Sequence, residues 1–218
     1  MSKSIKIITS VISLNHLLLC LLFCTLLIGS KALASDKRSN LISKYNLELS
    51  QIENYLNNLH NLSANFTQIT SSGSIANGKF YLSRPGKMRV EYDNKSSIII
   101  VVNGPVLSYY DAELDEISNL RTNTTPASLL TRKNISFDAK DIDLIDVVKK
   151  DNNIKITLAK KNNPNSGNFS LIFSLNPINF LQMEIYNDLD EVIKVNLRDV
   201  VQDKKLGNDL FILKNKNR

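Results

Sequence analysis

The stretch between residues 78 and 111 most constrains the fold of this chain, because strand patterns and turn signals follow one another closely in it. Gly78–Ser83 and Lys87–Tyr92 alternate apolar and polar residues, which is typical of strands with one buried face. Ile98–Val102 is continuously apolar, as expected of a strand covered on both faces. Asn103-Gly104 is a strong hairpin signal that returns the chain. The stretch therefore predicts an antiparallel meander with one strongly apolar face.

The first 34 residues have the pattern of a secretory signal peptide. Two lysines near the start precede the twelve-residue apolar run Leu17–Ile28, and Ala32-Leu33-Ala34 forms a cleavage signal before Ser35. The apolar run is shorter than a membrane span requires, although an uncleaved N-terminal anchor is the alternative. We therefore expect residues 1–34 to be removed on export and residues 35–218 to form a single domain.

Loss of this leader would change the chemistry available to the chain. Both cysteines, Cys20 and Cys24, lie in the leader, so neither disulfides nor thiolate chemistry would remain, and His60 would be the one histidine left. The leader contains three lysines and no acidic residue, so the net charge would fall from +6 to +3. A mildly basic exported chain without arginine clusters argues against a nucleic-acid partner.

Two helices are predicted beside the strands. Leu41–His60 is amphipathic, and its polar face includes Glu53 and Asn57. Pro126–Arg132 is short, with Pro126 at its first position and Thr125 as a candidate cap. The apolar residues of the longer helix step by three and four: Ile42, Tyr45, Leu49, Ile52, Leu56 and Leu59. The longer helix could permanently plug a curved sheet or act as a lid that lifts, and the shorter one is a second candidate plug.

The rest of the chain reads as short strands with polar turns, ending in a short strand at Phe211–Leu213. About eleven antiparallel strands with two helices favour the α+β class over a fold built from βαβ units.

Enzyme motifs are missing from this pattern. A Ser-His-Asp triad would have to use His60, which ends a predicted helix and lacks a nucleophile elbow. The carboxylates at Asp138, Asp141, Asp143 and Asp146 lack the glycine-containing loop of a calcium site and fit solvated side chains better. We therefore predict no catalysis, no metal and no cofactor. A container for apolar ligands and an ordinary β domain both remain open.

A set of ordered motifs resembles the LolA family of periplasmic outer-membrane lipoprotein carriers. The resemblance extends over nearly all of the sequence after the leader, and its second half matches as a strand pattern. The motifs are Phe66-x-Gln68, Gly78-Lys79-Phe80, Arg84-Pro85-Gly86-Lys87-Met88-Arg89-Val90-Glu91-Tyr92, Asn103-Gly104, Tyr109-Tyr110-Asp111 and Thr125-Pro126-Ala127-Ser128-Leu129-Leu130.

The resemblance implies a fold and a task. The fold is an incomplete, strongly curved antiparallel β-barrel with the N-terminal helix and the short central helix as a lid over an apolar cavity. The task is that of a periplasmic chaperone, which accepts lipoproteins released from the inner membrane by an ABC-type complex. It shields their acyl chains and delivers them to an outer-membrane acceptor or to the outer membrane itself. We expect this carrier to be a monomer.

The resemblance also implies roles for particular residues. Arg84 matches an arginine at the cavity mouth that is linked to lid closure by hydrogen bonds, and Met88 stands where the family has a bulky apolar residue. The expected acyl-chain cavity comprises Leu49, Ile52, Phe66, Phe80, Leu82, Met88, Val90, Leu107, Leu129 and Leu130. The alternative function is a non-enzymatic scaffold domain on the same fold that senses lipid or protein.

Overall fold

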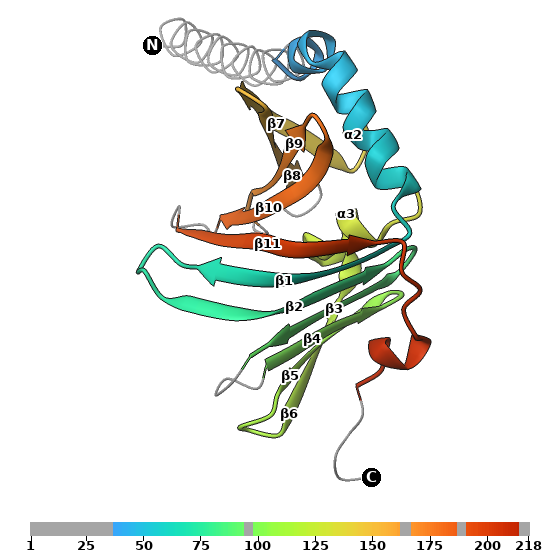
Figure 1. Cartoon of the computed structure of the whole chain (residues 1–218), viewed down its shortest axis with the longest axis vertical. Coiled ribbons are helices and arrows are strands. Elements are labelled where there is room, and N and C mark those ends of the chain that lie inside the picture. The colour runs from blue at the N-terminus through green and yellow to red at the C-terminus, as the bar shows by residue number, and fades with distance from the viewer. Residues whose placement is uncertain (1–36, 94–97, 162–166, 187–190, 214–218) are drawn as a thin grey trace, which may run out of the picture. The chain divides into compact units, whose positions relative to one another are not determined.

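The computed structural model describes residues 37–93, 98–161, 167–186 and 191–213. The chain divides into two units, residues 1–44 and Tyr45–Arg218. In the first unit, the described residues 37–44 are helical. The predicted leader and its cleavage site lie outside the described residues, so the expected domain limits stay a prediction. The second unit contains all the strands and the two helices considered below (Figure 1).

Eleven antiparallel strands form one sheet in the second unit. Their order across the sheet is β6-β5-β4-β3-β2-β1-β11-β10-β9-β8-β7. The bounds are β1 Asn61–Ile69, β2 Ile75–Ser83, β3 Lys87–Tyr92, β4 Ile98–Asn103, β5 Val106–Asp111, β6 Glu116–Arg121, β7 Ile142–Lys150, β8 Asn153–Lys160, β9 Phe169–Leu175, β10 Ile178–Tyr186 and β11 Val192–Gln202. The meander predicted between residues 78 and 111 is therefore confirmed as β2–β5.

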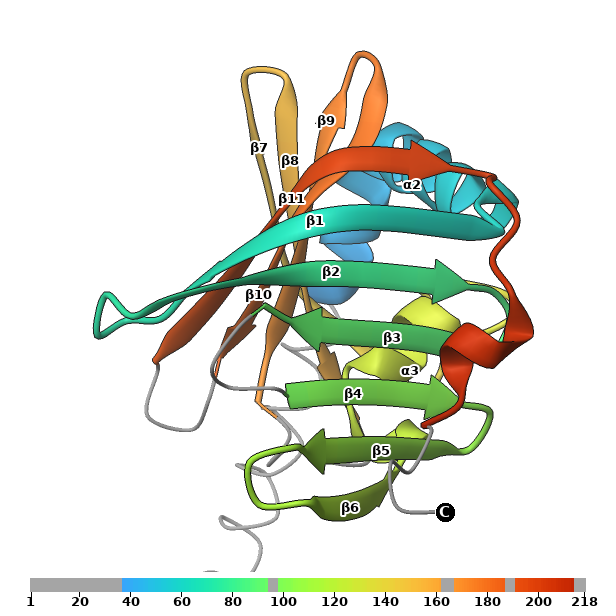
Figure 2. The ribbon, with the colours of Figure 1, turned by 60° about the horizontal axis from the view of Figure 1, so that its bottom comes forward.

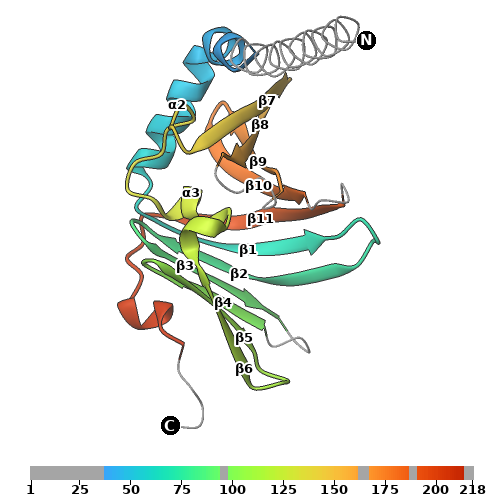
Figure 3. The same cartoon turned by 180° about the vertical axis from the view of Figure 1, so that it is seen from behind.

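The sheet curves strongly but does not close. The edge strands β6 and β7 do not pair with each other, while β1 and β11 pair in the middle and join the two halves. Figures 2 and 3 show that the halves bend toward the same side, with α3 (Ala127–Thr131) on that concave side. The predicted α+β class with an incomplete, curved barrel is thus confirmed.

The helices are shorter than predicted. Residues 41–44 of the predicted helix Leu41–His60 are helical, but the helix is interrupted at Tyr45. The main helix of the second unit, α2, covers Asn46–Asn58, because the backbone is extended at Leu59. Pro126 precedes α3 as its N-cap residue. The predicted cap at Thr125 is wrong, because its hydroxyl donates to the Thr122 carbonyl at 2.9 Å.

The predicted final strand Phe211–Leu213 is also wrong. Phe211 instead ends the short 3-10 helix η3, Asn208–Phe211, where its side chain is 1% exposed. This segment lies against β3 and β4, and Arg89 donates from Nη1 to the Leu210 carbonyl at 3.1 Å. Phe211 is thus buried by packing onto existing strands, and the segment does not join their ladder.

The core of the second half lies between α2 and the concave face of the sheet. Leu49, Ile52 and Leu56 of α2 are buried. Tyr55 packs edge-on against Phe173 of β9, with ring centroids 6.1 Å apart. The helical stripe predicted from the sequence is therefore the face that α2 buries against the sheet.

Gly78 allows a close approach in the first half of the sheet. It is paired with Phe66 on β1 and with Tyr92 on β3. The Phe66 and Tyr92 rings meet edge to face there, with centroids 5.3 Å apart. A Cβ at position 78 would lie 2.1 Å from the Glu91 carbonyl oxygen and 2.6 Å from the Phe66 ring. The absence of a side chain thus makes room for an aromatic pair.

We predict that Gly78→Ala destabilises the fold, because the added methyl group must displace both the Phe66 ring and the β3 backbone. Overpacking of this kind costs about 1–3 kcal/mol. Urea unfolding followed by circular dichroism measures the loss. The neighbouring Lys79→Ala, which alters an exposed side chain, should change the free energy of unfolding by less than about 0.5 kcal/mol. Equal stability of the two variants would contradict the prediction.

Candidate functional site

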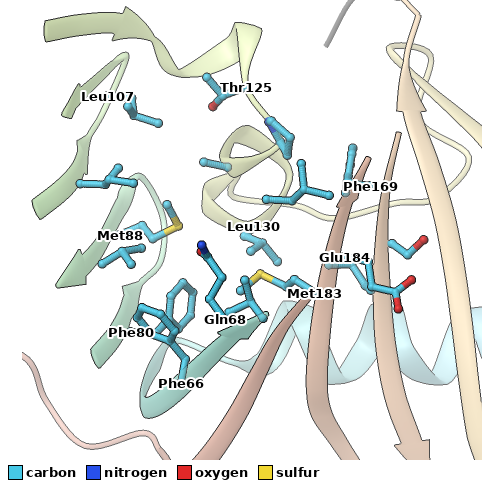
Figure 4. Close-up of a pocket in the computed structure, with 18 of the residues that line it drawn as sticks. Phe66, Gln68, Phe80, Met88, Leu107, Thr125, Leu130, Phe169, Met183 and Glu184 are labelled. Carbon is cyan, nitrogen blue, oxygen red and sulfur yellow. The ribbon is translucent and has the colours of Figure 1, made fainter. Parts of the chain in front are cut away.

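An apolar cavity of about 260 Å³ lies on the concave side of the sheet (Figure 4). Strands from both halves contribute to it, together with α3 and the turn before it. The lining residues are Phe66, Gln68, Phe80, Met88, Val90, Tyr92, Ile100, Leu107, Thr125, Pro126, Ala127, Leu130, Phe169, Ser170, Leu171, Met183, Glu184, Ile185 and Val195.

Strand alternation explains which side chains face the cavity. Successive side chains of a strand point to opposite faces. Met88, Val90 and Tyr92 of β3 therefore share the concave face, and Arg89 and Glu91 share the convex face, where they form a 2.5 Å ion pair. On β10, Figure 4 shows Met183 directed into the cavity and the Glu184 carboxylate directed away from it. Glu184 therefore lines the cavity without placing its charge inside.

The residues expected to form the cavity fall into two groups. Six of them line it: Phe66, Phe80, Met88, Val90, Leu107 and Leu130. The other four are not among its lining residues and are buried in the surrounding core: Leu49, Ile52, Leu82 and Leu129. Two of these, Leu49 and Ile52, belong to α2.

Sequence reasoning missed the wall formed by the second half of the sheet. Phe169, Leu171, Met183, Ile185 and Val195 contribute that wall from β9–β11. Their alternation in the predicted strands was the available signal, but it did not show that these strands face β2–β5 across one cavity.

Arg84, the residue expected to secure the lid, lies directly after β2 and contacts two separated segments. Its backbone N–H donates to the His60 carbonyl at 2.7 Å. Its guanidinium donates to the Arg132 carbonyl from Nη2 at 2.8 Å and from Nε at 3.2 Å. The remaining acceptors are the carbonyl of Leu56, the carbonyl of Leu59 at 3.5 Å, the Asn57 Oδ1 at 3.4 Å and the carbonyl of Lys133 at 3.2 Å.

These contacts join the end of α2 to the segment after α3. The last carbonyls of a helix lack partners within the helix, so a multidentate guanidinium satisfies several of them together. Burial lowers the pKa of the Arg84 guanidinium, because removal from water disfavours its charge. Arg84 therefore connects β2, α2 and the segment after α3 at one point.

The polar face of α2 holds the same segment. Asn57 Nδ2 donates to the Ile135 carbonyl at 2.9 Å, and the Ile135 N–H donates to Asn57 Oδ1 at 2.8 Å. Glu53 Oε1 accepts from the Phe137 N–H at 2.6 Å. These two side chains of the predicted polar face therefore bind the backbone of the segment after α3.

A separate set of charges holds α3 against β7 and β8. The Lys160 ammonium group donates to the Asn123 carbonyl and, at 2.8 Å, to the Ser128 hydroxyl. Burial, followed by the nearby Arg132 charge, lowers the pKa of Lys160. Arg132 Nη2 pairs with Asp141 Oδ2 at 2.9 Å, and its hydrogen bond lowers the Asp141 pKa. Asp141 is therefore a partner of the helix segment, in contrast to the solvated side chain that we expected.

We predict that Asn57→Ala weakens the attachment of α2, because it leaves the backbone groups of the buried Ile135 without partners. Unpaired buried groups cost about 1–3 kcal/mol, which urea unfolding would measure. The adjacent Asn58 is exposed and supplies a matched control, since Asn58→Ala should leave stability within about 0.5 kcal/mol of the wild type. An equally small effect at both positions would refute this role of Asn57.

The described part of the chain contains neither a helix able to cross a membrane nor a group of residues able to hold a metal ion.

The family of the outer membrane lipoprotein carrier protein LolA matches residues 57–214. An outer-membrane lipoprotein carrier protein of Coxiella burnetii is 26% identical, with 87% of this chain and 93% of that protein covered. An uncharacterized protein of Rickettsia prowazekii is 25% identical, with 78% of each chain covered. The crystal structure of a LolA superfamily protein from Nitrosomonas europaea covers 76% of this chain and 97% of its own, at 10% identity and a TM-score of 0.46. Because the family match extends over most of the sequence, this chain belongs to the LolA family.

Proposed function

We propose that this protein carries lipoproteins across the periplasm with their acyl chains in the apolar cavity. The cavity between the two halves of the sheet is the observation that carries the proposal. Family membership supports it, because the family takes its name from lipoprotein carriers, which are not enzymes. This agrees with the prediction that the chain is not a catalyst.

The physical need for such a container is large. Exposure of one methylene group to water costs about 0.8 kcal/mol, so a chain of about fifteen methylenes costs on the order of 12 kcal/mol. An acylated protein therefore does not leave a membrane unaided at a useful rate. A carrier whose walls are Phe, Leu, Met, Val and Ile side chains replaces the bilayer during transit.

The cavity must enlarge to accept its cargo. Its volume of about 260 Å³ is below the range of about 300–1,000 Å³ typical of pockets for drug-sized ligands. A lipoprotein carries several long acyl chains, which need more space than that. In our proposal α2 and α3 act as the lid, and loading moves them away from the concave face.

Arg84 serves as the latch of this lid in the empty state. Its hydrogen bonds join α2 and the segment after α3, so the lid cannot shift without breaking several of them. The bonds re-form when the cargo leaves, and this gain offsets part of the cost of releasing acyl chains. The latch thus makes release possible by stabilising the empty carrier.

The remaining parts of the proposal concern location and partners. Residues 1–34 act as a cleaved export signal. An ABC-type complex of the inner membrane supplies the cargo, and an outer-membrane acceptor or the outer membrane itself receives it. The carrier works as a monomer.

Recovery of the mature protein from a periplasmic extract that contains membranes tests the carrier function. We expect bound acylated protein in the purified sample and removal of lipoprotein from inner-membrane vesicles. A protein that is always free of ligand and removes none would overturn the proposal. Capture of a dedicated partner protein, without any lipoprotein transfer, would favour the sensing scaffold.

We predict that Arg84→Leu loads lipoprotein but passes it on at least about tenfold more slowly. The variant loses charge-assisted hydrogen bonds worth about 1.5–3 kcal/mol each, so its empty closed state is less stable relative to the loaded state. Transfer of radiolabelled lipoprotein to outer-membrane vesicles measures the effect. Arg121→Leu removes an exposed arginine of β6 and should transfer normally. Normal transfer by Arg84→Leu would refute the latch.

A further inference from the structure

One polar side chain in the cavity, Gln68 of β1, presents hydrogen-bond donors that the protein does not use. The Tyr92 hydroxyl donates to Gln68 Oε1 at 2.7 Å. Among the described residues, the amide nitrogen of Gln68 has no hydrogen-bond partner, and it is not a fully buried atom. Figure 4 shows this amide group extending from β1 into the cavity. Two N–H donors therefore face the space where a ligand would lie.

The other polar side chains around the cavity are already paired. The Thr125 hydroxyl donates to the Thr122 carbonyl, and the Ser170 hydroxyl is 2.9 Å from the Thr157 hydroxyl. The Glu184 carboxylate accepts from Lys155 and Tyr186, each at 2.5 Å. Gln68 differs from these groups because its donors have no such partner.

Tyr92 fixes the orientation of the amide. Burial raises the pKa of the Tyr92 phenol, with a smaller contribution from Tyr109. Its ring is held edge-on against Phe66. Because the hydroxyl donates to Oε1, the nitrogen of Gln68 is turned toward the cavity.

We propose that Gln68, oriented by Tyr92, binds the carbonyl oxygen of an acyl group, so that the cavity recognises an acyl chain and not merely hydrocarbon. The inference deepens the proposed carrier function and rests on it. An ester or amide carbonyl is the one hydrogen-bonding group that every acyl chain carries, and it accepts but does not donate. A neutral donor in an otherwise apolar wall matches that group.

The position of Gln68 also orients the ligand. The Arg84 N–H binds the carbonyl of His60, just before β1. Gln68 lies eight residues beyond His60, which is a distance of about 26 Å along the strand at about 3.3 Å per residue. Near the latch, Phe80 and Met88 are at most 7% exposed, whereas Ile185 on the cavity wall is 37% exposed. A carbonyl at Gln68 therefore places the head of the ligand at the exposed end and its tail toward Phe66 and Phe80.

A pair of ligands that differ in the carbonyl tests this site. The probes are a synthetic lipopeptide with two ester-linked palmitoyl chains and its analogue with two ether-linked hexadecyl chains. Each displaces a fluorescent dialkyl dye without carbonyl groups, which reports the dissociation constant. We expect the wild type to bind the ester about fivefold more tightly than the ether, as one neutral hydrogen bond allows.

Gln68→Met keeps the length of the side chain and removes the donors. It should bind the ether as tightly as the wild type does and lose the preference for the ester. Binding of the ether also verifies that this variant is folded. Tyr92→Phe keeps the ring and removes the orienting hydroxyl, so the ratio of ester affinity to ether affinity should decrease. Gln51→Leu alters an exposed glutamine of α2 and should keep the full preference.

Equal binding of ester and ether by the wild type would overturn the carbonyl site and leave the carrier function in place. A preference that survives in both Gln68→Met and Tyr92→Phe would overturn it as well. If neither lipopeptide displaces the dye, diacyl and dialkyl phosphatidylglycerol replace them. Tighter binding of the diacyl than of the dialkyl lipid that depends on Gln68 supports the site and contradicts lipoprotein as the cargo. Equal binding of the two lipids overturns the site.

Discussion

The pairing of the first strand with the last determines the rest of this structure. Because β1 pairs with both β2 and β11, all eleven strands belong to one sheet, and its free edges are β6 and β7. A sheet that bends without closing exposes an apolar concave face, which water disfavours. The helices must therefore cover that face, but they are attached by side chains and by the hydrogen bond from the Gly86 N–H to the Thr131 carbonyl, and not by a ladder of strand hydrogen bonds. A cover attached in this way can be removed while the sheet stays intact.

The Arg84 guanidinium holds this cover through neutral groups. All acceptors of its guanidinium are carbonyl or amide oxygens, and no carboxylate pairs with it among the described residues. Transfer of a cation from water is costly, and neutral dipoles offset that cost less completely than an opposite charge does. A buried ion pair at this point would secure the lid more firmly. Neutral acceptors therefore suit a contact that, in the proposed function, breaks once in every cycle.

Local patterns in the sequence predicted the strands better than the contacts between them. Alternation located β2 and β3, and the apolar run located β4, because these signals depend on the chain alone. The same signals failed at Phe211, which is apolar because η3 packs against β3 and β4 and not because it pairs in the sheet. They also failed at Asn57, whose partners lie 78 residues away in the sequence. Contacts between residues so far apart in the sequence produce no periodic pattern of residue types.

The candidate site shows the same division. A run of apolar residues marks a wall, so Phe80, Met88 and Val90 could be assigned to the cavity from the family resemblance. The polar pair could not, because a glutamine in a strand and a tyrosine in another are ordinary residues until register brings them together. Gln68 and Tyr92 lie on β1 and β3, on either side of β2, and their side chains meet across that strand.

The attachment of α3 links the lid to both halves of the sheet. Lys160 and the Arg132–Asp141 pair fix it to the β7–β8 side, whereas Arg84 fixes the segment after it to β2. A change in the curvature of the sheet that moves β2 relative to β8 would therefore act on both attachments. The Gly86 N–H also donates to the Thr131 carbonyl at 2.7 Å, so α3 itself is bound to the turn between β2 and β3 as well. In the proposed carrier, movement of α3 away from the concave face must therefore break contacts with both halves of the sheet.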